Sequence, residues 1–105
     1  MQVSFQLTHL DISNNAIGDA GCIALMHSVE RAQCMYELHL EANNIGAPAA
    51  PAISQAVTRS NLRALFLDNN RLGTDGGSMI FASVSMYYVF DSCIFKGVLT
   101  LQISS

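Results

Sequence analysis

The sequence predicts an α/β solenoid, a short right-handed horseshoe arc with parallel strands inside and helices outside. A phrase that approximates L-x-x-L-x-L-x-x-N-x-[I/L]-G occurs three times, at residues 7–18, 35–46 and 62–73, with Ile12 and Met35 in place of leucine. Its asparagines are 28 and then 27 residues apart. Each phrase begins with alternating apolar residues and leads into a stretch with helical apolar periodicity. Repetition at such a period indicates stacked units rather than one globular core.

A short strand opens each unit. Leu7, Leu10 and Ile12 are separated by polar residues, which is typical of a strand with one buried side. The same spacing recurs in the other two phrases, so the stacked strands form a parallel sheet. We expect the leucines of this pattern to be buried: Leu10, Leu38, Leu40, Leu65 and Leu67.

A tight turn follows each strand. We expect the recurring asparagines Asn15, Asn43 and Asn70 to form a structural ladder, because a buried amide can bond to free backbone groups of its own turn and of the next one. A glycine then lets the backbone turn sharply at 18, 46 and 73. Asp19 and Thr74 come next in two units, and both residue types predict helix N-caps.

The helices are predicted from a second apolar pattern. In the first unit the stripe contains Gly21, Ala24, Leu25, Ser28 and Val29, and the third unit places Met79 and Ile80 at the corresponding central positions. Helices are about 10 Å wide and strands about 4.8 Å apart, so stacking such units bends the array into an arc.

The whole chain, 1–105, is predicted to be a single domain with repeats at 7–34, 35–61 and 62–89. Residues 90–105 form a degenerate fourth repeat or a cap. We expect a fourth strand at 89–95, which would place Ile94 beside Phe66. The tail GVLTLQISS predicts an irregular edge strand that uses Leu99, Leu101 and Ile103.

Both ends of the predicted array are apolar where solenoids usually carry a polar cap. Val3 and Phe5 stand at one end, and the apolar residues of 90–103 stand at the other. This indicates a truncated segment of a longer repeat protein, and the alternative is self-capping by the tail together with dimerisation. Uncapped repeats would also allow end-to-end self-association.

Composition narrows the class of partner. The chain is half apolar, 12% charged and carries a formal charge of −3, with its few basic residues scattered. This argues against nucleic acid or an anionic membrane as the partner. We expect no signal peptide. We also expect no membrane span, because the apolar run at 79–90 is too short to cross a bilayer. Three cysteines, Cys22, Cys34 and Cys93, without a secretory signal predict reduced thiols in the cytoplasm, with the nucleus as the alternative.

These repeats resemble the leucine-rich-repeat family, and specifically its ribonuclease-inhibitor-like subclass. The resemblance covers about residues 5–86 and is carried by the three phrases, by the turns IGDAG (17–21) and LGTDG (72–76), and by Cys34 before the second strand. The second unit departs from the pattern with GAPAAPA at 46–52. Ribonuclease inhibitor, NOD-like sensors and the Ran GTPase activator carry similar repeats, which implies protein binding for this chain.

The polar positions beside the strand leucines should point to the inner, concave face. Four carboxylates make this face acidic, and Phe66 is expected to be an exposed apolar anchor, a combination that suits a protein interface. We therefore predict that another protein with a basic surface binds there. The candidate partner-binding residues are His9, Asp11, Ser13, Glu37, His39, Glu41, Phe66 and Asp68.

Chemistry on small molecules is not predicted. Asp11 should lie beside His39, with His9 nearby, a grouping compatible with metal binding or acid–base catalysis. An open sheet supplies no pocket, however, so we interpret it as a surface Asp–His pair. We expect no catalytic residue, metal or cofactor. The leading hypothesis is a non-catalytic protein-binding module; the alternatives are a regulator of a small GTPase, as in the Ran activator, and a truncated segment with no independent function.

Overall fold

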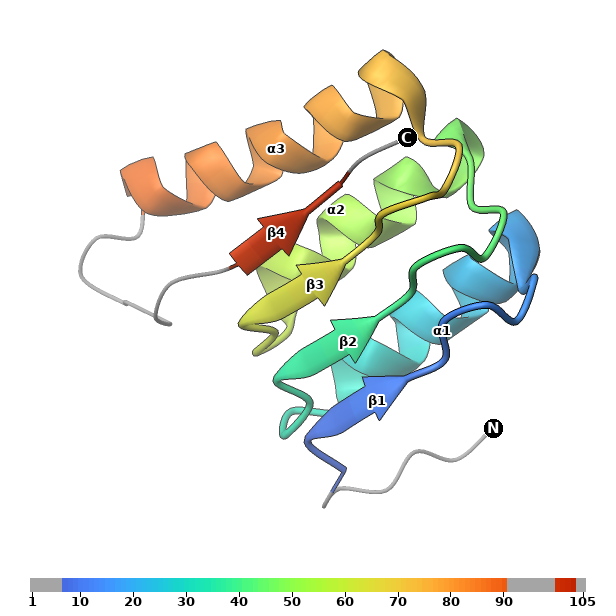
Figure 1. Ribbon diagram of the computed structural model, residues 1–105. Helices are drawn as coiled ribbons and strands as arrows, with labels where there is room; N and C mark the ends of the chain where they lie inside the picture. The colour runs from blue at the N-terminus through green and yellow to red at the C-terminus, as the bar shows by residue number, and fades with distance from the viewer. Residues whose placement is uncertain (1–6, 91–99, 104–105) are drawn as a thin grey trace.

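The computed structural model describes residues 7–90 and 100–103 of the chain, and Figure 1 shows their arrangement. Three strand–helix units follow one another, and a final strand completes the sheet. The elements are β1 (His9–Asp11), α1 (Gly18–Arg31), β2 (Glu37–His39), the short 3₁₀ helix η1 (Ala47–Ala49), α2 (Ala50–Arg59), β3 (Ala64–Phe66), α3 (Gly73–Phe90) and β4 (Thr100–Gln102).

The strands form one parallel sheet in the order β1-β2-β3-β4. Leu10, Leu38, Leu65 and Leu101 occupy the same row of this sheet. The helices lie in a layer on one side of it, with α2 between α1 and α3 (Figure 1). Strands that follow one another in sequence are therefore neighbours in the sheet, which confirms the predicted α/β solenoid.

The core lies between the sheet and the helix layer. Leu38, Leu40, Leu65 and Leu67 are fully buried there, as the apolar spacing predicted. Leu10 is only partly buried, so the expectation for this residue was too strong. Its strand, β1, is the first of the sheet and has a strand neighbour on one side only in the part of the chain that the structure describes.

Asparagine side chains connect the turns of successive units. Oδ1 of Asn43 accepts hydrogen bonds from the backbone N–H groups of Asn15 at 2.8 Å and Ile17 at 3.5 Å. Oδ1 of Asn70 likewise accepts from the N–H groups of Asn43 at 2.8 Å and Ile45 at 3.0 Å. Each side-chain amide also donates backward, Asn43 to the carbonyl of the preceding unit's Ile12 at 3.0 Å. The turns are thus joined by repeated hydrogen bonds across the units.

The expectation that Asp19 and Thr74 cap helices was wrong. The N-cap of α1 is Ile17, without a side-chain hydrogen bond, and α3 already begins at Gly73. Oδ1 of Asp19 instead accepts a hydrogen bond from the backbone N–H of Gly46 at 2.6 Å. The helix therefore starts at the turn glycine, and the carboxylate in its first turn is free to bond to the next unit.

The buried side of α1 and of α3 differs in part from the predicted stripe, whereas the stripe predicted for the second unit is buried or partly buried in η1 and α2. Ala24 is exposed in α1, and Met79 is 45% exposed in α3. Cys22 and Met26 are fully buried in α1 although the predicted stripe omitted them. In the described part of the chain α1 packs against α2, and α2 packs against α3, so the buried residues of a helix depend on its helix neighbours as well as on the sheet.

The expected strand at 89–95 was wrong in its position. Residues 89 and 90 belong to α3, and residues 91–99, which include Ile94, lie outside the described residues. The run from 79 to 90 contains no glycine or proline to stop the helix. The strand beside β3 is β4, so Gln102 is the neighbour of Phe66. The tail strand was correctly expected, with Leu101 and Ile103 packed against the core.

Candidate functional site

The face of the sheet opposite the helices carries the predicted polar residues in aligned columns. His9 and Glu37 are paired across β1 and β2, with Ala64 next on β3. Asp11 and His39 are paired in the same way, followed by Phe66. The parallel register therefore brings these residues together, as the equal spacing within the units requires.

An aromatic stack lies at the centre of this face. The rings of His39 and Phe66 are 4.3 Å apart between centroids and within 9° of parallel. Phe66 is half-buried rather than exposed, so the expectation of a free apolar anchor was wrong. The imidazole of His39 covers one side of the ring, because the two residues are direct partners in adjacent strands.

Two glutamate side chains contact the imidazole of His39. Nε2 of His39 lies 2.6 Å from Oε2 of Glu37, and Nδ1 lies 3.5 Å from Oε2 of Glu41. The other oxygen of Glu37 lies 3.8 Å from Nε2 of His9. The hydrogen bond from His39 to the Glu37 carboxylate is the main cause that raises the pKa of His39; Glu41 adds to this rise, and partial desolvation opposes it. The two carboxylates thus stabilise the imidazolium form of His39.

Ser13, Glu41 and Asp68 form a further column, just beyond the ends of β1, β2 and β3. The hydroxyl of Ser13 donates to Oδ1 of Asp11 at 2.6 Å and lies 3.0 Å from Oε1 of Glu41. Ser13 also donates its backbone N–H to Asp11. The two hydrogen bonds that Ser13 donates to Asp11, from its hydroxyl and from its backbone N–H, lower the pKa of Asp11. Asp68 continues the column, since its backbone carbonyl accepts a hydrogen bond from the N–H of Ala42.

Asp11 and His39 lie side by side as expected, and the charge of His39 adds to the lowering of the pKa of Asp11, although their direct hydrogen-bond partners differ. They are strand partners, but Asp11 bonds to Ser13, and His39 bonds to Glu37 and Glu41. Four carboxylates share the face with two histidines, one of which is already engaged between glutamates. The described face therefore carries more carboxylates than histidines.

Sequence reasoning missed Gln102, which β4 places beside Phe66. The alternation of Leu101 and Ile103 in the tail was the signal that could have aligned it with Leu65. It also missed Tyr36 and Arg63, which precede β2 and β3. The Arg63 guanidinium lies 4.9 Å from the centre of the Tyr36 ring, a cation–π contact that no periodic pattern reveals.

Within residues 7–90 and 100–103, no group of three or more His, Cys, Asp or Glu side chains is placed to hold a metal ion. No helix in this part is long and apolar enough to cross a membrane. Cys22 is buried, which raises the pKa of its thiol to about 12, and Cys34 is exposed.

Comparison with known proteins gives two matches. A sequence profile for a family described as leucine-rich repeat matches residues 3–26. The chain is also 33% identical over 78 residues to the NACHT, LRR and PYD domains-containing protein 3 of Macaca mulatta. That alignment covers 72% of this chain and 8% of the relative, so the chain spans a small part of the relative's length.

Proposed function

Because this chain belongs to the leucine-rich-repeat family, we propose that it is a non-catalytic protein-interaction module whose concave strand face binds a partner protein. The observation that carries this proposal is the acidic face with the His39–Phe66 stack at its centre. Flat aromatic surface surrounded by charge is typical of interface hot spots. Rows of side chains on a rigid parallel sheet present this surface without the ordering cost of a loop.

A partner with a basic surface fits this face best. Asp11, Glu37, Glu41 and Asp68 supply the negative charge, and opposite charge on a partner accelerates association and selects against acidic surfaces. The edges of the Phe66 ring that His39 leaves open offer apolar contact at the centre. We propose Lys- or Arg-rich protein segments as the ligand class.

Three finer assignments belong to this proposal. The helices α1 and α2 that follow the strands support the ribonuclease-inhibitor-like subclass. Two thiols without a disulfide, at Cys22 and Cys34, support a cytoplasmic location. The small share of the multidomain relative that the chain covers supports a role as part of a longer interaction scaffold.

Affinity capture with matched charge variants tests the site. The full chain is immobilised in three forms: unmodified, Glu41→Lys/Asp68→Lys, and Asp75→Lys. Asp75 lies in the first turn of α3, away from the strand face, so its reversal controls for a charge reversal outside that face. We expect specifically captured proteins to be lost with the double variant and kept with Asp75→Lys. Each captured protein is then purified and its affinity for the three forms measured.

The salt dependence of these affinities provides the second readout. Binding to the acidic face should weaken as ionic strength rises from about 0.05 to 0.5 M, because screening shortens the reach of the charges. Equal affinities for the unmodified chain and the double variant would move the partner site away from the concave face. An increase of GTP hydrolysis by a captured small GTPase would instead support the regulator alternative.

A further inference from the structure

Both ring nitrogens of His39 face a carboxylate. Nε2 lies 2.6 Å from Oε2 of Glu37, and Nδ1 lies 3.5 Å from Oε2 of Glu41. A carboxylate only accepts hydrogen bonds, so each contact is favourable only while the nitrogen that makes it carries a hydrogen. The imidazolium has two N–H groups, whereas the neutral ring has one. Both contacts are therefore satisfied only in the protonated ring, and deprotonation breaks one of them.

The contact with Glu41 is the one that deprotonation breaks. Nε2 keeps its hydrogen, because its contact with Glu37 is the shorter of the two. The proton leaves Nδ1 for solvent, and the lone pair that remains there faces Oε2 of Glu41 and repels it. Glu41 keeps a neutral partner, since its Oε1 lies 3.0 Å from the hydroxyl of Ser13. Its negative charge is then no longer balanced by the imidazolium.

The other neighbours of His39 hold its ring in place. On β3, Phe66 stacks on the imidazole at 4.3 Å between centroids and within 9° of parallel, which keeps the ring in the plane that points its nitrogens at the two glutamates. On β1, the strand partner Asp11 is already bonded to Ser13. The described titratable groups around His39 are Glu37, Glu41, Asp11 and His9, with Asp68 next to Glu41 in its column.

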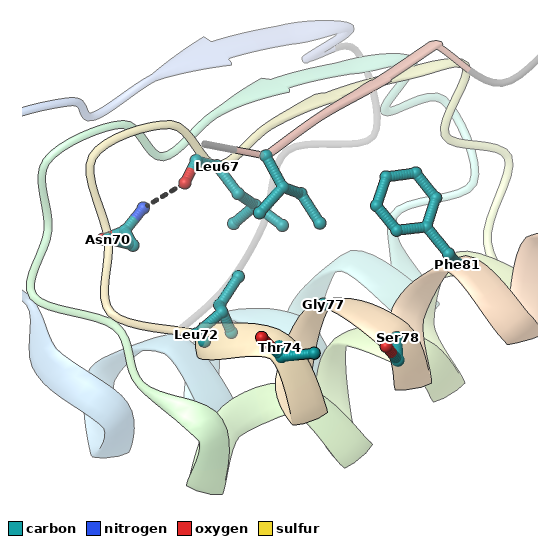
Figure 2. Close-up of a pocket in the computed structure, with 9 residues that line it drawn as sticks. Leu67, Asn70, Leu72, Thr74, Gly77, Ser78 and Phe81 are labelled. Carbon is teal, nitrogen blue, oxygen red and sulfur yellow. Dashed lines mark hydrogen bonds between the residues drawn. The ribbon is translucent and has the colours of Figure 1, made fainter. Parts of the chain in front are cut away.

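Asp68 gives the released Glu41 a second carboxylate as its neighbour. The two residues follow adjacent strands, and equivalent positions of adjacent strands lie about 4.8 Å apart. The turn that carries Asp68 is fixed by Asn70, whose side-chain amide donates to the carbonyl of Leu67 at 3.0 Å (Figure 2) and to that of Asp68 at 3.4 Å. Two adjacent carboxylates attract a Lys or Arg side chain more strongly when no imidazolium lies beside them.

We propose that His39 is a proton-operated switch of the strand face, which weakens the binding of a Lys- or Arg-rich protein segment while it is protonated and releases Glu41 to that segment when it is neutral. This inference rests on the proposed function, because it names the regulation of the same site. The bonds to Glu37 and Glu41 raise the pKa of His39, so the switch operates as pH rises through a value above 6.5. By linkage, a bound cationic segment lowers the pKa of His39.

The probe for a basic segment is octalysine, a fluorescently labelled peptide with an amide at its C-terminus. Its affinity for the full chain is measured by fluorescence anisotropy at low salt from about pH 5.5 to 8.5, where ordinary carboxyl groups and lysines keep their charge. We expect the affinity to rise about fivefold over this range, the effect of removing one charge about 5 Å from a bound cation in water. His39→Gln is neutral at every pH and should reduce the rise to less than about 1.5-fold.

The other two histidines provide matched controls. His27→Gln removes an exposed histidine of α1, outside the strand face, and His9→Gln removes the second histidine of that face. The rise in affinity should persist in both variants. NMR of the isotopically labelled, unmodified chain gives a readout that needs no variant. The signal of the Glu41 carboxyl carbon should change at the pH at which His39 loses its proton, and saturating octalysine should lower that pH.

The possible results separate this proposal from the proposed function. Octalysine binding that is independent of pH, or a rise that persists in His39→Gln or is lost in His9→Gln, would overturn the switch and leave the basic partner standing. A Glu41 carboxyl signal that stays constant while His39 titrates would also overturn it. Absence of octalysine binding at every pH would refute the basic partner itself, and its regulation with it. Binding that rises with pH and is lost in Glu41→Lys/Asp68→Lys would support both.

Discussion

The asparagine ladder yields a quantitative prediction for Asn43→Ala. Asn43 is fully buried, and the substitution removes two short hydrogen bonds, from the Asn15 N–H at 2.8 Å and to the Ile12 carbonyl at 3.0 Å. Each contributes about 1 kcal/mol net, and each partner left unsatisfied in the interior costs about 1–3 kcal/mol. Because water can reach the partly exposed first turn, we expect a total loss of about 2–4 kcal/mol. A domain of this size has about 5–15 kcal/mol of stability.

The assay is urea unfolding of both chains followed by circular dichroism, with the free energy of unfolding extrapolated to zero denaturant. Asn15→Ala is the internal control. Asn15 occupies the same position in the first unit but is exposed, and its amide donates only to nearby carbonyls of its own turn, so its loss should cost less than about 1 kcal/mol. Equal losses at the two positions, or an Asn43→Ala chain as stable as the parent, would refute the ladder argument.

Three further predictions concern the core, the histidine and the thiols. Leu65→Ala should lower the free energy of unfolding by about 2–5 kcal/mol. Leu10→Ala should lower it by clearly less, because Leu10 is partly exposed. Urea unfolding of both variants compares the two losses. The raised pKa of His39 means that its contribution to stability is fully present below its ordinary pKa of about 6.5 and is lost as pH rises through the higher folded value. Unfolding measured from pH 5 to 9 should show this decline, and His39→Gln should remove it. In a Cys93→Ser background, a thiol reagent at pH 8 should modify the exposed Cys34 rapidly. Cys22 should react only on unfolding, because burial raises the pKa of its thiol to about 12. Equal reaction rates at the two thiols would contradict this.

Repetition in the chain was sufficient to predict the solenoid, the parallel sheet and the columns of side chains across its strands. Three copies of one phrase at nearly equal spacing place His9 against Glu37 and Asp11 against His39, because equal spacing in stacked units means equal height in the sheet. The buried leucines of β2 and β3 follow from the same periodicity. These features depend on local pattern and its recurrence, both of which are visible in the sequence.

Tertiary structure alone decided what each side chain contacts between units. Asp19 could serve as a helix cap or as a partner for the next turn, and its 2.6 Å bond to Gly46 depends on where the second unit lies. Phe66 is half-buried because the His39 ring stacks on it, and the place of the fourth strand depended on how far α3 continues. Periodicity in the sequence predicts which residues of successive strands share a row of the sheet. Hydrogen bonds, ring stacking and burial depend on how far apart these residues lie and how their side chains are oriented, and only the packing of the units determines this.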